Sequence, residues 1–115
     1  MNLITLRKLC ELVGVSRRSI QGYENAGLMM PSSKNKWGHL LYDENALHRA
    51  QYINFLQQLG FKLKEIKEII DAPDCMKKEA IERRIKELKV EQIRMEQIIQ
   101  KAREYIENDD ENVVV

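Results

Sequence analysis

The sequence has very few residues of the kinds that cross-link small domains or anchor a chain in a membrane. Its two cysteines, Cys10 and Cys75, lie far apart, which excludes a disulfide framework and a zinc-finger spacing. No run of about 18 apolar residues could cross a bilayer, and the N-terminus lacks the apolar stretch of a signal peptide. These absences predict a cytoplasmic protein with no membrane role.

Groups suited to catalysis or metal binding are also scarce. The two histidines, His39 and His48, stand alone, and no short motif gathers a nucleophile, a base and an orienting carboxylate. The 115 residues suffice for one modest domain with an extension and leave little room for a large enclosed active site. We therefore expect no enzyme, no metal site and no cofactor.

The charge of the chain is nearly balanced overall but unevenly distributed. The formal net charge is only +1. Residues 1–60 contain seven Lys or Arg and four Asp or Glu, a balance of +3, whereas residues 61–115 contain twelve and fourteen, a balance of −2. Because the distribution of charge matters more than its total, the first half is the candidate for contact with nucleic acid.

Segment 16–28 has the start and the end of a short surface helix. Ser16 can cap the first free backbone N–H groups, Gly27 suits a left-handed residue after the helix, and Pro31 prevents an early restart. Arg17 and Arg18 lie in the first turn, where cations oppose the helix dipole. Stability alone would favour acidic residues there, so these arginines indicate contact with DNA, with Arg18 as base reader and Arg17 at a phosphate.

The same helix is expected to read DNA with its outward face. At about 100° per residue, with Ile20 facing inward, that face is polar and small. For Tyr23 two interpretations remain open: packing with its hydroxyl on a phosphate, or packing alone. The residues of the outward face are Arg18, Gln21, Gly22 and Asn25.

A second short helix is predicted just before the reading helix. Thr5 is a candidate cap, Leu6, Leu9 and Val13 share one face, and Gly14 supplies the turn. Two short helices joined through a glycine turn, the second one basic at its start, form a helix-turn-helix.

Residues 31–42 fit a small β-hairpin wing, with a solvated loop as the alternative. Gly38 lies at or near the turn. Trp37, the only tryptophan, is interpreted either as a contact to the DNA backbone or minor groove or as packing of the wing, and Tyr42 as packing more than binding. The residues expected near the phosphate backbone are Lys34, Lys36, Trp37 and His39.

The rest of the chain is predicted to be helical. One helix begins at the cap Asp43 and ends at Gly60, and a shorter one stops before Pro73. Residues 77–108 then show apolar residues at alternating steps of four and three, the repeat of a coiled-coil seam, whose partner we expect to be a second copy. Gln92, the polar member, either sets the register or reaches solvent. The seam comprises Ile81, Ile85, Leu88, Gln92, Met95, Ile99, Ala102 and Ile106.

Several strings in this order resemble the MerR family of bacterial transcription regulators. They are residues 13–16 and 23–28 with Pro31, residues 38 and 42–44, and residues 56–66. The resemblance implies a mainly α fold, with a winged helix-turn-helix domain over 1–73 and an antiparallel coiled-coil dimer helix over 77–108. It also implies a homodimer that binds double-stranded DNA at a pseudo-palindromic promoter, with RNA polymerase as a further partner. Residues 109–115 are expected to be a short tail, too short for an effector domain, so no small-molecule effector is expected.

The chain departs from this pattern at residues expected to touch DNA. Relatives usually carry Arg and an aromatic residue at the positions of Gln21 and Gly22, and Arg at the position of Leu40. With about 0.9 of salt slope lost per missing phosphate contact, we expect weaker and less salt-sensitive binding. Cys75 stands where metal-sensing relatives place a ligand, but no second cysteine completes a site, so we interpret it as structural.

The resulting prediction is a dimeric, sequence-specific DNA-binding regulator of transcription. Two other interpretations stay open. One is a DNA-architectural protein that bends DNA with the same winged domain. The other is an interaction module that recruits partners through its coiled coil and no longer binds DNA.

Overall fold

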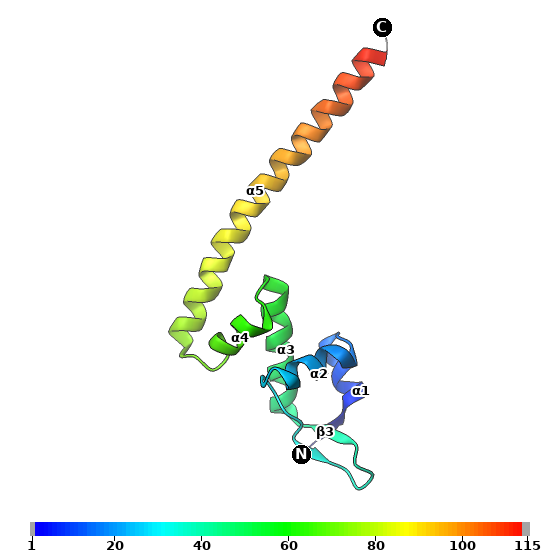
Figure 1. Ribbon diagram of the computed structural model, residues 1–115, viewed down its shortest axis with the longest axis vertical. Helices are drawn as coiled ribbons and strands as arrows, with labels where there is room; N and C mark the ends of the chain where they lie inside the picture. The colour runs from blue at the N-terminus through cyan, green and yellow to red at the C-terminus, as the bar shows by residue number, and fades with distance from the viewer. Residues whose placement is uncertain (1, 114–115) are drawn as a thin grey trace. The chain divides into compact units, whose positions relative to one another are not determined.

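The computed structural model describes residues 2–113, with side chains described up to residue 108, and it is mainly helical (Figure 1). The chain divides into two compact units, residues 1–77 and residues 78–115. The first unit contains a small sheet and four helices, and the long last helix begins within it. In chain order the elements are β1 (Ile4–Thr5), α1 (Leu6–Val13), α2 (Arg17–Asn25), β2 (Ser33–Lys34), β3 (Leu40–Tyr42), α3 (Glu44–Leu59), α4 (Leu63–Ile69) and α5 (Asp74–Val113).

Three helices begin at the caps that the sequence predicts. The side chain of Thr5 accepts a hydrogen bond from the Lys8 backbone N–H, Ser16 accepts from Ser19, and Asp43 accepts from Ala46. Each cap satisfies one of the backbone donors that a helix start leaves free. Because each of these contacts spans only three residues, the local sequence was sufficient to predict where the three helices begin.

The turn between α1 and α2 is made by a left-handed residue, as predicted. Gly14 has φ +80°, a conformation that side chains with a Cβ rarely adopt, and its N–H donates to the Cys10 carbonyl. Gly27, the second residue after α2, is also left-handed at φ +74°. The two helices of the predicted helix-turn-helix are therefore present with the expected connection.

The sheet contains one strand that the sequence analysis did not predict. Strand order is β1-β3-β2, and both pairs are antiparallel. Ile4 pairs with Tyr42 and Ser33 with Leu41, so the predicted hairpin of β2 and β3 is confirmed and β1 joins its other edge. Two residues cannot show a period-two pattern, which is why β1 was missed.

The core of the first unit lies between the four short helices and β3. Leu9, Ile20, Ile53, Leu56 and Ile66 have their side chains fully buried. Burying a side chain of this size contributes about 1.5–3 kcal/mol, so these five residues account for much of what holds α1 to α4 together.

One large apolar residue of α3 lies at the edge of this core. Phe55 is 44% exposed and contacts Tyr52 edge to face, with ring centroids 6.3 Å apart. Its neighbour Leu56 takes the buried position, because adjacent residues point about 100° apart on a helix.

The last helix is longer than the predicted 77–108. Helix α5 starts at Asp74, where the Pro73 carbonyl accepts hydrogen bonds from the Met76 and Lys77 N–H groups. It continues to Val113, so most of the predicted tail, 109–115, is helical, and residues 114–115 lie outside the described residues. The acidic residues near its end do not stop the helix, since Asp and Glu are compatible with helical backbone.

Candidate nucleic-acid interface

Helix α2 has a buried face and an exposed face, as the sequence analysis predicts. Ile20 and Tyr23 are buried at no more than 1% exposure and anchor the helix to the core. The other face is polar and carries two cations at its start, where the helix dipole would favour anions. Its exposed residues are Arg17, Arg18, Gln21 and Asn25.

Gly22 leaves a gap between the side chains along this helix. It is half-buried, and a Cβ built there would meet no atom within 4 Å. The backbone of α2 is therefore accessible between the side chains of Arg18 and Asn25, which lie one turn to either side. At Gly22, a ligand would meet no side chain between it and the helix backbone.

The two tyrosines among the candidate residues lie in the core. The Tyr23 hydroxyl donates to Gln57 Oε1 at 2.8 Å, and the Tyr42 hydroxyl donates to Glu24 Oε1 at 2.6 Å. Burial raises the pKa of both hydroxyls, and at Tyr42 the hydrogen bond and charge of Glu24 raise that pKa further. In this structure both hydroxyls are neutral donors within the protein, and they hold α2 against α3 and β3.

The wing carries its polar residues on a turn organised by Asn35. Asn35 Oδ1 accepts hydrogen bonds from the backbone N–H groups of Trp37 and His39, at 2.9 and 3.0 Å. Gly38, at φ +81°, permits the turn as predicted, since an L side chain would be strained there. The wing residues predicted to contact DNA are all exposed: Lys34, Lys36, Trp37 and His39.

The tip of the wing combines a cation with an aromatic ring. Lys36 Nζ lies 4.5 Å from the centroid of the Trp37 ring, within the range of a cation–π contact, and Trp37 is 70% exposed. Such a pair offers charge to a phosphate and a flat apolar face to a sugar or base.

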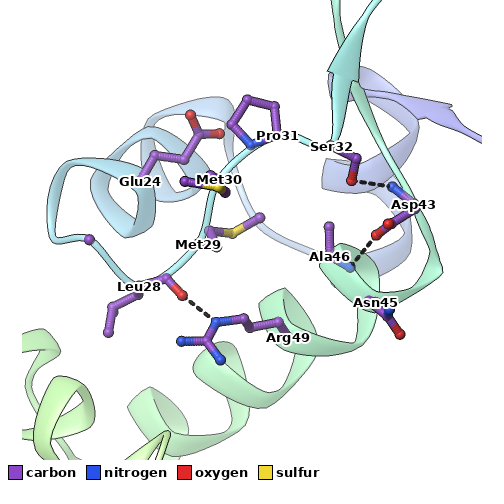
Figure 2. A pocket seen from close by; sticks show the side chains of 11 residues that line it. Glu24, Leu28, Met29, Met30, Pro31, Ser32, Asp43, Asn45, Ala46 and Arg49 are labelled. Atoms are coloured by element: carbon purple, nitrogen blue, oxygen red, sulfur yellow. Dashed lines mark hydrogen bonds between the residues drawn. The ribbon is translucent and has the colours of Figure 1, made fainter.

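Arg49 of α3 braces the segment that follows α2, a role that the sequence analysis missed. Its Nε donates to the Leu28 carbonyl (Figure 2), and its two terminal nitrogens donate to the Asp71 carboxylate at 2.9 and 3.1 Å. The guanidinium lowers the pKa of Asp71 through these hydrogen bonds and its charge. The only local signal was an arginine beside the buried face of α3, which does not identify its partners.

An open groove of about 770 Å³ lies beside this brace. Figure 2 shows Glu24, Met29, Met30 and Arg49 among the residues that line it, and Ser32 Oγ accepts a hydrogen bond from the Asp43 N–H at one side. Among the described residues no cluster of three or more His, Cys, Asp or Glu side chains could hold a metal ion. We assign no ligand to this groove.

The two cysteines do not combine into a site. Cys10 is half-buried in α1, and burial raises the pKa of its thiol. Cys75 is exposed in the first turn of α5.

Within residues 2–113, no helix has the length and apolarity needed to cross a membrane.

The predicted seam residues all lie on α5. In its C-terminal half they are exposed, with Met95 at 62%, Ile99 at 51% and Ile106 at 61%. Large apolar side chains in a row at coiled-coil spacing leave an unpartnered stripe on this part of the second unit.

Known proteins with similar sequences are transcription regulators. The chain is 36% identical over 95 residues to the HTH-type transcriptional activator mta of Bacillus subtilis, covering 83% of this chain and 37% of that protein. It is 28% identical to the mercuric resistance operon regulatory protein of Bacillus cereus, covering 71% of this chain and 72% of that one. The chain thus spans little more than a third of the length of mta.

Solved structures and a family profile agree with these sequence matches. The N-terminal part of the Bacillus subtilis multidrug transporter activator, MtaN, is 33% identical with a TM-score of 0.72, covering 90% of this chain and 97% of that one. HiNmlR, described as a MerR family regulator lacking the sensor domain and bound to promoter DNA, has the same fold at 20% identity, with a TM-score of 0.70 over 86% of this chain and 80% of that one. The profile described as MerR HTH family regulatory protein matches residues 4–73. The chain therefore belongs to the MerR family of helix-turn-helix regulatory proteins.

Proposed function

We propose that the chain is a sequence-specific DNA-binding regulator of transcription that acts as a homodimer. The observation that carries this proposal is the outward face of α2, where Arg18, Gln21 and Asn25 are exposed while Ile20 and Tyr23 anchor the helix. A rigid helix with these side chains fits a major groove, and an arginine can donate two hydrogen bonds to one guanine. Arg18 is the proposed base reader and Arg17 a phosphate contact.

The wing supplies the second part of the proposed interface. Lys34, Lys36 and His39 are exposed near its turn, where cations can bind the phosphate backbone. Trp37, held beside Lys36, is proposed to contact the backbone or minor groove. Residues 1–73 are thereby assigned to DNA binding.

The second unit is proposed to hold two copies together. Its exposed seam residues, such as Met95 and Ile99, favour burial against another helix of the same pattern. We assign residues 77–108 to this role. A two-fold dimer presents two α2 helices to half-sites about 34 Å or a multiple of that apart, so the operator should be pseudo-palindromic.

RNA polymerase at the promoter is the further proposed partner. The support is that mta, a relative of this chain, is named a transcriptional activator. A protein with these partners works where the DNA is, in the bacterial cytoplasm. That the protein takes no small-molecule effector stays a prediction, and calorimetric titration of the free protein with candidate ligands checks it.

Selection of bound duplexes from a random pool tests the proposed function. The wild-type chain should enrich one pseudo-palindromic motif, and Arg18→Ala should lower affinity by about 5- to 150-fold for each half-site that the dimer contacts, the value of one bidentate base contact. Arg83→Ala is the matched control, since it removes another exposed arginine, which pairs with Glu79 on α5. No enriched motif, or equal losses in both variants, would contradict the proposal.

A further inference from the structure

Beside the seam, α5 carries four charged residues at seven-residue spacing. This charge row consists of Glu82, Lys89, Glu96 and Arg103, and all four side chains are exposed. Among the side chains that the structure describes, none of the four forms an ion pair, although other α5 residues do. Residues in this position flank the contact between two coiled-coil helices. Their charges influence which helix binds and in which orientation.

The seam itself has a centre. Its eight positions run from Ile81 to Ile106, and the midpoint falls between Gln92 and Met95. Two antiparallel helices bury the whole seam only if these midpoints coincide, because any other register leaves apolar positions uncovered at the ends. In that register the facing residues of the two copies are Ile81 and Ile106, Ile85 and Ala102, Leu88 and Ile99, and Gln92 and Met95.

The same register places opposite charges of the charge row together. Glu82 faces Arg103 of the second copy, and Lys89 faces Glu96 of the second copy. The two-fold axis repeats both pairs, so every member of the row obtains a partner. We propose that the charge row sets the register of the antiparallel dimer that the family resemblance implies, so that the two copies are centred between Gln92 and Met95. This inference specifies further the dimer of the proposed function and rests on it.

Other arrangements of two copies bring like charges together. A slip of one heptad in one direction places Glu82 beside Glu96 and Lys89 beside Lys89 of the other copy. A slip in the other direction places Lys89 beside Arg103 and Glu96 beside Glu96. Like charges at these distances repel, so the row adds to the cost of sliding, which already leaves apolar positions uncovered at the ends of the seam.

A parallel pair is opposed in a similar way. In register, it would bring Arg84 near Lys89 and Glu91 near Glu96 of the other copy, because parallel helices pair the two flanks of the seam with each other. The antiparallel pair joins members of the charge row only to one another. Charge pattern and seam symmetry therefore favour the same arrangement.

Charge-swapped variants test the proposed pairing by sedimentation. An acidic-row variant carries Lys89→Glu and Arg103→Glu, and a basic-row variant carries Glu82→Lys and Glu96→Lys. One exposed pair changes an equilibrium by roughly 1.5- to 5-fold, so four pairs turned repulsive should raise the dimer dissociation constant of each variant alone at least on the order of tenfold. An equimolar mixture should recover dimers that contain one chain of each kind.

A control variant separates the charge row from net charge. Lys86→Glu with Lys101→Glu makes the same change in charge as the acidic-row variant, but both lysines are exposed on the side of α5 away from the seam. This control should dimerise as the wild type does. Dimerisation of the acidic-row and basic-row variants at wild-type strength would overturn the proposal.

Cross-linking tests the orientation directly. With Cys10→Ser and Cys75→Ser as background, a chain with both Ile85→Cys and Ala102→Cys should form a covalent dimer with a short bismaleimide. Ile85→Cys alone should not, since antiparallel helices hold the two copies of residue 85 about 25 Å apart. A dimer cross-linked through Ile85→Cys alone would refute the antiparallel register but not the dimer, whereas a wild-type monomer at micromolar concentration would refute both.

Discussion

Replacing Gly22 by alanine should raise the free energy of unfolding by about 0.8–1 kcal/mol. Gly22 lies inside α2, which runs from Arg17 to Asn25, and a glycine inside a helix costs this amount relative to alanine because its backbone loses more freedom on folding. An added methyl group would meet no atom within 4 Å. Gly22 is also not among the glycines with positive φ, so neither a clash nor backbone strain offsets the gain.

The same substitution at Gly27 is the matched control, and it should have the opposite sign. Gly27 has φ +74°, and a Cβ there would lie 3.3 Å from Lys67 Nζ. An L residue in the left-handed region costs about 1–2 kcal/mol, which exceeds the gain from a less flexible unfolded chain. The two variants therefore separate helix propensity from backbone conformation within one short segment.

Urea unfolding followed by circular dichroism measures both effects. Protein concentration must be equal in all samples, because the stability of a dimer depends on it. We expect the midpoint of Gly22→Ala to rise and that of Gly27→Ala to fall, with unchanged slopes. A lower urea midpoint for Gly22→Ala would contradict this prediction. It would mean that other atoms occupy the space where the methyl group would lie, or that the backbone of α2 is strained at Gly22.

Two further predictions concern contacts that join distant parts of the chain. Arg49 lowers the pKa of Asp71, so the ion pair between them stabilises the folded protein. This stabilisation is fully present above the ordinary aspartate pKa of about 4, and it is lost as the pH falls through the lower pKa of the folded state. Asp71→Asn should then have a lower urea midpoint than wild type at pH 7, and the difference should vanish in acid; a difference that persists there would contradict the assignment. Tyr42→Phe should lower the free energy of unfolding in urea by about 1–3 kcal/mol, because Glu24 loses the hydroxyl that donates to it. Tyr105→Phe, at a residue that is 70% exposed, is the control and should cause no measurable change. Equal effects of the two substitutions would show that the hydrogen bond contributes little.

The helix starts and the exposed face of α2 were predictable because their causes are local. A cap such as Ser16 contacts a backbone N–H three residues away, and the inward direction of Ile20 follows from helical period. The wing turn at Gly38 and the continuous repeat along α5 are also short-range patterns. The predicted base reader and wing residues are exposed for the same reason.

The support behind this face was not predictable. Tyr23 and Gln57 are 34 positions apart in the chain, Tyr42 and Glu24 are 18 apart, and Arg49 and Asp71 are 22 apart. No periodicity connects such residues, and each side chain has several possible partners before the helices pack. Strand β1 was missed for a related reason, since two residues become a strand only when β3 lies beside them.

The sequence by itself determined where most helices begin and end, which side of α2 is polar, and the repeat on α5, because each depends on neighbours within a few residues. Only the tertiary structure decided that the hydroxyls of Tyr23 and Tyr42 are engaged inside the protein and that Arg49 braces the segment after α2. These roles require partners brought together by folding. A side chain that could equally reach a phosphate or a carboxylate is assigned only when the packing shows which of the two lies within hydrogen-bond distance.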